Sequence, residues 1–352
     1  MEEQRDDTNR ISYTSPISDL EGMSEVLRRT FLRHGLVAFS SPVIGMDELR
    51  HVVAALNNAR RYADDQVAQH FQRQLQYCAA NDGAEGPKSI VPAIMGQIAS
   101  LDELIRQVKP AFRRSLLRVA AESSEFAAWL YRDLALPVQA TYWRDRALEF
   151  AQEASDFSMQ GYVLLKKSQA AWDERDALHM LTMAQAVQEG PWNLPLRVQA
   201  EAVQQEARAL AMTGAKPTTI AAKLSQAREL LLQESEQSGI SAHYNKALFS
   251  LQVALSYRES GQLDACLDLF DRYLSPENMS HRDYGYFLAL QSGALARSGA
   301  PDAAAHMGIQ ALSLARETYS ARTGEEVYRL VKQLYRWKDR DSVRELLNHF
   351  YG

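Results

Sequence analysis

Cysteine and long hydrophobic runs are scarce in this sequence. Two cysteines in 352 residues are too few for a disulfide scaffold and are typical of a reducing compartment. Long uncharged runs, such as 35–46 and 89–101, fall short of the ~18–20 apolar residues that a membrane-spanning helix requires. We therefore expect a cytoplasmic chain without a membrane partner.

Basic charge is not in excess either. The 39 lysines and arginines face 44 aspartates and glutamates, which gives a formal charge of −5. A protein that coats nucleic acid or a membrane surface usually carries net positive charge, so any such contact must be local. With 46% hydrophobic and 24% charged residues, the composition excludes a disordered or low-complexity chain.

Glycine (17 residues) and proline (11 residues) are few, and they cluster at intervals such as 81–87, 190–195 and 298–301. Between these breaks, apolar residues recur three and four positions apart, for example Leu248, Leu251 and Leu255. Neighbours at that spacing share one helical face. The pattern predicts an all-α fold of helices joined by short turns.

The sequence also repeats itself with a period of 37–38 residues. Gly261 and Gly299 are 38 positions apart, as are the small residues Cys266 and Ala304, and earlier copies follow at an offset of 37. A fixed period of this length indicates stacked units, each made of two antiparallel helices. Because a lone hairpin cannot cover its apolar face, we predict a superhelical stack of hairpins, an α-solenoid.

One unit resembles the tetratricopeptide repeat at five positions. Ala254, Tyr257, Gly261, Cys266 and Phe270 stand where that repeat has a small, an aromatic, a glycine, a small and an aromatic residue. The units here are at least three residues longer than the usual 34 of that repeat. The resemblance implies that the small residues let helices approach closely and that the aromatic rings wedge between neighbouring hairpins.

A second resemblance covers roughly residues 25–340. Five segments carry it: 130–133 (LYRD), 142–147 (YWRDRA), 159–169 (MQGYVLLKKSQ), 189–192 (EGPW) and 204–207 (QQEA). They resemble the C-terminal sensor region of actinobacterial Xre-type helix-turn-helix transcriptional regulators. The resemblance implies a role in transcriptional regulation, with a peptide, a small molecule or a protein as ligand. Because residues 1–45 show no helix-turn-helix pattern, we expect that the DNA-binding domain is missing.

We expect three regions along the chain. They are an N-terminal extension over 1–45, partly disordered, N-terminal helices over 46–118 that cap the solenoid, and degenerate tetratricopeptide-like repeats over 119–352. Arg28 and Arg29 before the apolar run 35–39 resemble an export signal, but no Ala-x-Ala cleavage site follows. Tyr335, Trp337 and Phe350 are expected to cap the last repeat; the alternative for them is a homodimer contact.

Motifs for catalysis or metal binding are not found. The eight histidines include no His-x-x-x-His or His-Glu-x-x-His pair that would place two ligands on one helical face. Cys78 and Cys266 lie in separate helical segments with no base indicated nearby, so we interpret them as packing thiols. We therefore expect no metal, no cofactor and no enzymatic activity.

Helical-repeat proteins present the first helix of each hairpin to a concave groove. The inward-facing candidates are Trp129, Arg132, Lys166, Gln169, Gln204, Arg208, Arg258 and Tyr286. Glutamine can bond the main chain of a peptide, arginine and lysine can hold a carboxylate, and aromatic rings supply apolar contact area. The pattern indicates a groove that binds a peptide or a protein.

Three functions are compatible with these observations. The leading hypothesis is a non-enzymatic regulatory protein that binds its partner in the groove and acts through a separate transcription regulator. The second is a direct DNA-binding regulator that uses residues 1–45 and a basic helix over 106–118, which carries Arg106, Lys109, Arg113, Arg114 and Arg118. The third is an enzyme on a helical scaffold, which would need converging groups with shifted pKa values in a closed cavity.

Overall fold

The structure is a computed structural model that describes residues 46–234, 239–241 and 243–352. Within these ranges the chain forms helices and turns and no strand, so the predicted all-α class is confirmed. The expected N-terminal extension and the export-like segment lie outside the described residues.

The first described part consists of helices that precede the regular hairpins. Asp64 begins α4 by accepting hydrogen bonds from the backbone N–H groups of Gln66 and Val67. Pro87 begins α5, where its fixed φ suits the first helical turn. The elements are α2 (Met46–Asn57), α3 (Ala59–Tyr62), α4 (Asp65–Glu85) and α5 (Pro87–Gln107).

The rest of the chain consists of antiparallel helices joined by short connections. Two 3-10 helices, η3 (Pro276–Asn278) and η4 (Tyr335–Trp337), lie between them. The α-helices are α6 (Pro110–Asp133), α7 (Pro137–Glu153), α8 (Phe157–Asp173), α9 (Ala177–Glu189), α10 (Leu196–Met212), α11 (Pro217–Gln233), α12 (Lys246–Glu259), α13 (Leu263–Tyr273), α14 (His281–Arg297), α15 (Pro301–Glu317), α16 (Ala321–Leu334) and α17 (Asp341–Tyr351).

One backbone turn recurs where these helices end. After Tyr257, for example, Gly261 has a φ of 81° and the N–H of Gln262 donates to the Tyr257 carbonyl over 2.9 Å. This is the Schellman pattern, which satisfies the last carbonyl groups of a helix. The same positive φ occurs at Ala135, Ser155, Arg175, Gly214, Gly299 and Tyr319. Because most of these residues are not glycine, the structural repeat is more regular than the sequence period.

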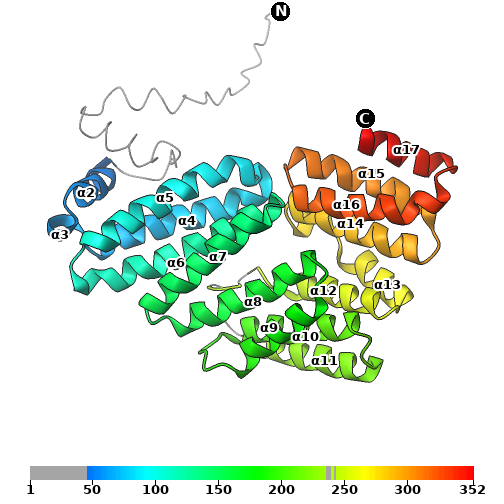
Figure 1. The fold of residues 1–352 in the computed structure, drawn as a ribbon, viewed down its shortest axis with the longest axis horizontal. Helices are drawn as coiled ribbons and strands as arrows, with labels where there is room; N and C mark the ends of the chain where they lie inside the picture. The colour runs from blue at the N-terminus through cyan, green and yellow to red at the C-terminus, as the bar shows by residue number, and fades with distance from the viewer. Residues whose placement is uncertain (1–45, 235–238, 242) are drawn as a thin grey trace, which may run out of the picture.

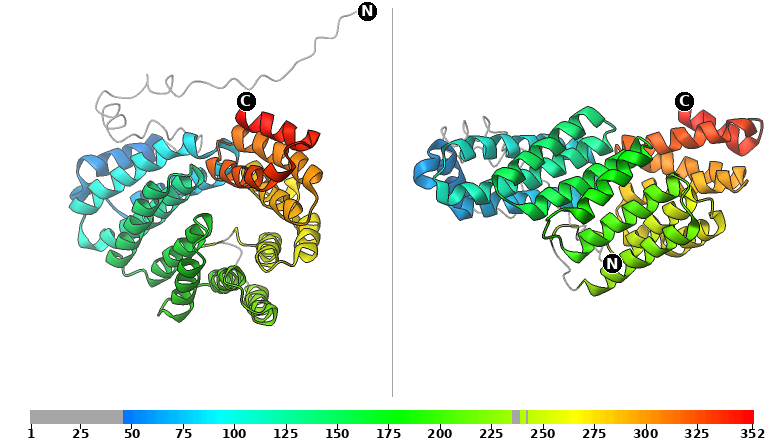
Figure 2. Two further views of the ribbon diagram at one scale, coloured as in Figure 1. Left: turned by 45° about the vertical axis from the view of Figure 1, so that its right-hand side comes forward. Right: turned by 60° about the horizontal axis from the view of Figure 1, so that its bottom comes forward.

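The hairpins stack in a curved row, as Figures 1 and 2 show. Helices α6, α8, α10, α12, α14 and α16 pack in succession on the inner side, and the alternating helices cover the outer side. The small residues Ala254, Cys266 and Ala304, predicted to lie at close helix contacts, are fully buried. Tyr257 packs against the cores of two neighbouring hairpins, which is the wedge position predicted for an aromatic ring. The predicted helical-repeat stack is therefore confirmed.

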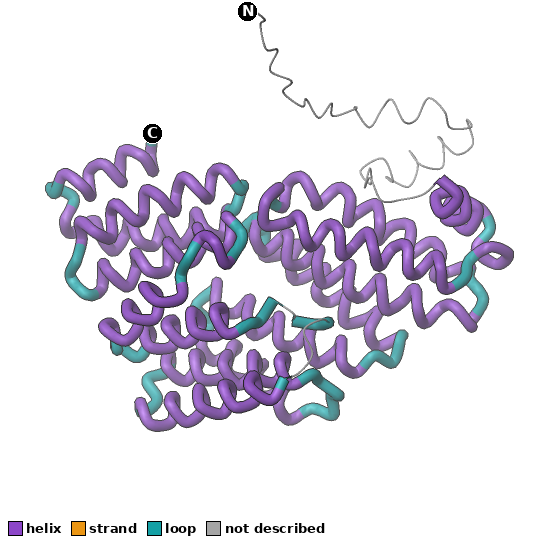
Figure 3. Tube along the Cα trace, turned by 180° about the vertical axis from the view of Figure 1, so that it is seen from behind, coloured by secondary structure: helices purple, strands orange, loops and turns teal. Residues whose placement is uncertain are grey.

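The row curls until helices from its N-terminal and C-terminal parts meet. Helix α14 contacts α4, and α16 contacts α6 (Figure 3). At this junction Arg282 binds Asp82, although the two residues are 200 positions apart in the sequence. The inner helices therefore surround a centre of buried polar and aromatic side chains, and the closure replaces the long open groove that the sequence interpretation assumed.

Because the helices are in close contact at the buried alanines, a larger side chain at these positions should destabilise the fold. Replacing Ala254 or Ala304 by leucine should lower the free energy of unfolding by about 1–3 kcal/mol, because the side chain has no space to enter. Ala303 is exposed on the same helix as Ala304, so Ala303→Leu is the matched control. Urea unfolding followed by circular dichroism measures the difference. An unchanged midpoint in Ala254→Leu and Ala304→Leu would contradict this packing.

Two expectations about the ends of the solenoid are refined by the structure. The boundary expected at residue 118 falls inside α6, which begins at Pro110 and runs to Asp133. Apolar residues at helical spacing, such as Leu116 and Val119, continue across that boundary and are buried, so nothing ends the helix there. At the other end, Trp337 and Phe350 pack on the C-terminal core, whereas Tyr335 is largely exposed.

Candidate functional site

The eight residues predicted for the groove all lie on inner helices. Trp129 and Arg132 are on α6, Lys166 and Gln169 on α8, Gln204 and Arg208 on α10, Arg258 on α12 and Tyr286 on α14. Their placement on the inner side follows the prediction. The last four, however, are buried. Arg208, Arg258 and Tyr286 contact Trp172 of α8. A ligand that lies on the surface cannot touch Gln204, which is fully buried and donates to the Gln252 carbonyl over 3.3 Å.

The three polar candidates on α6 and α8 are engaged in contacts between neighbouring hairpins. Arg132 binds the carboxylate of Asp173 and donates to the Gln169 carbonyl over 2.9 Å. Gln169 in turn donates to Glu201 on α10, and Lys166 contacts the Gln169 side chain over 3.3 Å. These bonds join successive inner helices, so these side chains stabilise the stack as well as facing its inner side.

Trp129 lies at the junction where the solenoid closes. Its Nε1 donates to Asp82 over 2.9 Å, and the guanidinium groups of Arg282 and Arg322 lie 4.9 and 4.7 Å from its ring. Asp133, which is fully buried, accepts from Arg322 over 3.4 Å. Two acidic residues of the N-terminal helices thus pair with two arginines of the C-terminal helices.

Trp172 forms a second centre on the inner side. The ring is 1% exposed, and its Nε1 donates to the hydroxyl of Tyr286 over 3.2 Å. Three guanidinium groups lie against it, with Arg175, Arg208 and Arg258 at 3.9, 4.8 and 5.3 Å from the ring centre. A tryptophan face attracts cations, so this ring holds three positive charges close together.

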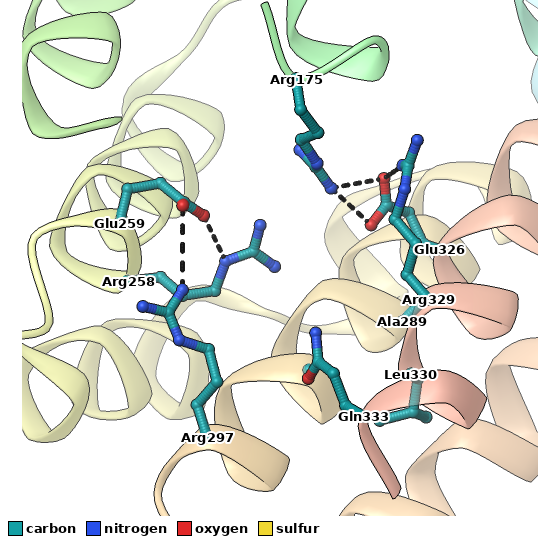
Figure 4. A pocket seen from close by; sticks show the side chains of 10 residues that line it. Arg175, Arg258, Glu259, Ala289, Arg297, Glu326, Arg329, Leu330 and Gln333 are labelled. Carbon is teal, nitrogen blue, oxygen red and sulfur yellow. Dashed lines mark hydrogen bonds and ion pairs between the residues drawn. The ribbon is translucent and has the colours of Figure 1, made fainter. Parts of the chain in front are cut away.

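A cavity of about 140 Å³ opens beside this centre, between α8, α12, α14 and α16. In Figure 4, Arg175 and Arg329 converge on Glu326, and Arg258 and Arg297 converge on Glu259. The lining residues are Arg175, Arg258, Glu259, Ala289, Gly293, Arg297, Glu326, Arg329, Leu330 and Gln333. Four arginines and two glutamates give the lining an excess of two positive charges.

The ion pairs in this cavity are uneven. Arg175 holds both oxygens of Glu326, over 2.9 and 2.8 Å. On the opposite wall, Arg258 donates through Nε to Glu259 over 3.0 Å, whereas Arg297 reaches Glu259 only at 3.8 Å. The arginines therefore outnumber the carboxylate groups that could neutralise them.

Burial disfavours the charged form of the arginines around Trp172. Desolvation lowers the pKa of Arg208 to about 10, and the charge of Arg258 acts in the same direction. Desolvation also lowers the pKa of Arg175, although Glu326 opposes the shift. The Nε and Nη2 atoms of Arg208 are buried without a hydrogen-bond partner. Buried polar atoms without a hydrogen-bond partner are costly, so this region would gain from a bound negative charge.

Sequence reasoning found one residue of the cavity lining, Arg258, and missed the other charged ones. Arg175 stands in a turn, at a positive φ of 60°, so helical periodicity does not predict its direction. Glu326 lies 151 positions away from Arg175 and comes near it only through the closure. Arg297 is the last residue of α14, and Arg329 lies on a partly exposed face of α16. At these positions the pattern of small residues does not predict where a side chain points.

The remaining candidates for chemistry are accounted for by packing. Cys78 and Cys266 are buried, and burial raises the pKa of each thiol to about 11, which disfavours the reactive thiolate. Among the described residues, no group of three or more histidine, cysteine, aspartate or glutamate side chains is placed to hold a metal ion. A larger hollow of about 470 Å³ beside Asp302 and Arg340 is wide open, and these two residues pair with each other.

The basic helix expected over 106–118 is wrong. Arg106 belongs to the end of α5, and α6 begins at Pro110, because the residue before a proline is disfavoured in helical geometry. Arg106 pairs with Asp102, Arg113 with Glu153 and Arg118 with Asp156. The segment is therefore two helix ends with partly neutralised charge.

Comparison with known proteins returns no matching family model and no matching curated sequence. The fold and the site themselves define the class: an all-α helical-repeat protein with an arginine-lined cavity on its inner side. In the part of the chain that the structure describes, no helix combines the length and the apolar character needed to cross a membrane.

Proposed function

We propose that this chain is a non-enzymatic regulatory protein that binds a peptide or protein partner on the inner side of its helical-repeat stack. The observation that carries the proposal is the cavity beside Trp172, where four arginines face two glutamates. Guanidinium groups bind carboxylates in two-pronged contacts. The tetratricopeptide-like pattern of small and aromatic residues supports the same conclusion.

The pathway that we propose is transcriptional control in the cytoplasm. The support is the resemblance of five sequence segments to the sensor region of Xre-type regulators, together with the low cysteine content. In this proposal the protein acts by associating with a separate transcription regulator, and the partner bound on the inner side changes that association.

Direct DNA binding has less support. Arg106, Arg113 and Arg118 each face a carboxylate, whereas non-specific binding to DNA needs several lysines and arginines available to phosphates. A gel-shift titration over salt concentration separates the two functions. We expect no sequence-specific shift at physiological salt; a specific shift that weakens steeply with salt would favour the DNA-binding function.

A pair of matched tryptophan substitutions tests the inner side as the binding surface. Gln333 is exposed at the cavity, so Gln333→Trp should obstruct it with little effect on stability. Val138 is 78% exposed on α7, and Val138→Trp is the control on the outer side. The measurement is a pull-down from native cytoplasm, quantified by mass spectrometry. We expect Gln333→Trp to capture at least tenfold less of the specific partner than the wild type does, and Val138→Trp to capture as much as the wild type. Equal capture by both variants would reject the inner side.

A further inference from the structure

The cavity beside Trp172 has the composition of an anion site. Guanidinium groups reach it from four different elements: Arg175 from the turn after α8, Arg258 from α12, Arg297 from α14 and Arg329 from α16. Arg329 is anchored to the Asp173 carbonyl over 2.6 Å. Because the donors come from separate elements and point to one space (Figure 4), the tertiary structure holds them in place before any ligand arrives.

The positive charge at this place exceeds the negative charge. Two glutamates, Glu259 and Glu326, face four arginines in the lining. Arg208 adds a fifth positive charge against the shared Trp172 ring, with two buried nitrogen atoms that lack a hydrogen-bond partner. Like charges gathered in one place repel each other, and a bound anion would reduce that repulsion.

Charge and volume together select the kind of anion. The excess of two positive charges in the lining matches a dianion better than a single carboxylate. A phosphate monoester carries about −1.5 to −2 charges at pH 7 and three acceptor oxygens, and guanidinium groups recognise such oxygens in pairs. The cavity of about 140 Å³ is close to the ~150 Å³ that accommodates a benzene molecule in an engineered cavity. It holds a phosphoryl group but not a whole nucleotide.

We propose that the cavity lined by Arg175, Arg258, Arg297 and Arg329 binds the dianionic phosphoryl group of a phosphorylated ligand. The body of that ligand then extends past Gln333 toward the solvent. This inference rests on the proposed function in so far as the inner side is the binding surface, and it names the group that is recognised there. Free phosphate and a phosphorylated peptide share this chemistry, and the experiment distinguishes them.

Calorimetric titration of the full chain in phosphate-free buffer at pH 7.5 tests the site. The probes are inorganic phosphate, sulfate, acetate and a serine-containing peptide with and without a phosphate. We expect saturable binding of phosphate and sulfate, at least tenfold weaker binding of acetate, and binding of the peptide only when phosphorylated. A phosphopeptide that binds more tightly than inorganic phosphate identifies a peptide as the source, whereas equal affinity identifies the free anion.

The variants are chosen to keep the fold. The side chains of Arg297 and Arg329 are 38% and 32% exposed, so Arg297→Gln with Arg329→Gln should fold and should weaken phosphate binding at least tenfold. Arg272→Gln with Arg344→Gln makes the same charge change at exposed ion pairs outside the cavity lining and should bind like the wild type. A Cβ atom at Gly293 would meet only the Arg258 guanidinium, at 3.7 Å, so Gly293→Ala narrows the cavity in a folded protein and should also weaken binding.

The pH dependence adds a readout that general stability does not affect. The second pKa of a phosphate monoester is about 6, so its dianionic fraction falls as the pH decreases. Between pH 7.5 and pH 5.5 we expect the affinity for the phosphorylated peptide to fall several-fold, while the affinity for sulfate, a permanent dianion, stays nearly constant. No saturable phosphate binding, acetate binding of equal strength, or undiminished binding in the Arg297→Gln, Arg329→Gln variant would overturn the proposal.

The outcomes separate the phosphoryl site from the proposed function. Suppose that the wild type captures its partner, that Gln333→Trp abolishes this capture, and that the protein binds no phosphate. This result would overturn only the phosphoryl site and would leave the proposed function in place. The opposite outcome is phosphate binding that requires Arg297 and Arg329, together with equal capture of the partner by Gln333→Trp and Val138→Trp. It would overturn only the inner side as the partner surface and would leave the phosphoryl site in place.

Discussion

Replacing Asp133 by alanine is expected to lower the free energy of unfolding by about 3–5 kcal/mol. Its carboxylate is fully buried and accepts from the hydroxyl of Ser320 over 2.7 Å and from Arg322 over 3.4 Å. Arg282 lies 3.9 Å away. Removal of the carboxylate leaves buried positive charge without its partner, which is far more costly than losing an exposed ion pair.

The measurement is a urea titration of the wild type, Asp133→Ala and the control Asp268→Ala. Asp268 and Arg272 form an ion pair whose side chains are each 62% exposed, so the control should unfold with the wild-type midpoint. Small-angle scattering provides a second readout, because Asp133 joins α6 to the C-terminal hairpins. We expect Asp133→Ala to have a larger radius of gyration than the control. Identical midpoints and radii for both variants would show that the closure does not depend on this residue.

Replacing Trp172 by alanine should cost a similar amount, about 3–5 kcal/mol, by a different mechanism. The side chain is 1% exposed and is the largest of the fully buried ones, so its removal leaves a cavity in addition to the lost burial. It also removes the surface against which Arg175, Arg208 and Arg258 lie. Three guanidinium groups would then repel each other without the attraction of the ring.

Two further substitutions separate these contributions. Trp172→Phe keeps an aromatic ring and loses the bond from Nε1 to Tyr286, so it should cost about 1–3 kcal/mol. Tyr142→Ala removes an aromatic ring that is 56% exposed and should change the unfolding midpoint little. From the highest to the lowest unfolding midpoint, the order should be Tyr142→Ala, then Trp172→Phe, then Trp172→Ala. A midpoint of Trp172→Ala equal to that of Tyr142→Ala would contradict the central role of this ring.

The helices and their pairing could be predicted from the sequence because they depend on local patterns. Ala254, Cys266 and Phe270, which match small and aromatic positions of the repeat, are all fully buried, and Gly261 and Gly299 end their helices as the period indicates. The ends of the helices were predicted less well than their existence. Pro110, for example, begins a new helix within the segment 106–118, which the sequence pattern indicates as one basic helix. Helix ends depend on single residues, whereas helix faces depend on many.

The candidate site could be predicted only in part. Arg208, Arg258 and Tyr286, which the sequence predicts to face inward, lie on inner helices, because the period of the repeat orients each helix. The sequence does not indicate that they gather around Trp172. Each residue was assigned from its own repeat, and the contacts that matter join different repeats.

The amino-acid sequence by itself determined that this chain forms helices, that the helices pair into hairpins, and which faces of the hairpins are apolar. Apolar spacing and turn residues act over a few positions, so they can be read along the chain. Only the tertiary structure decided that the row of hairpins closes, with Asp82 against Arg282 and Arg175 against Glu326. The angle between successive hairpins accumulates along the stack, so a small rotation at each contact decides whether residues 150–200 positions apart meet.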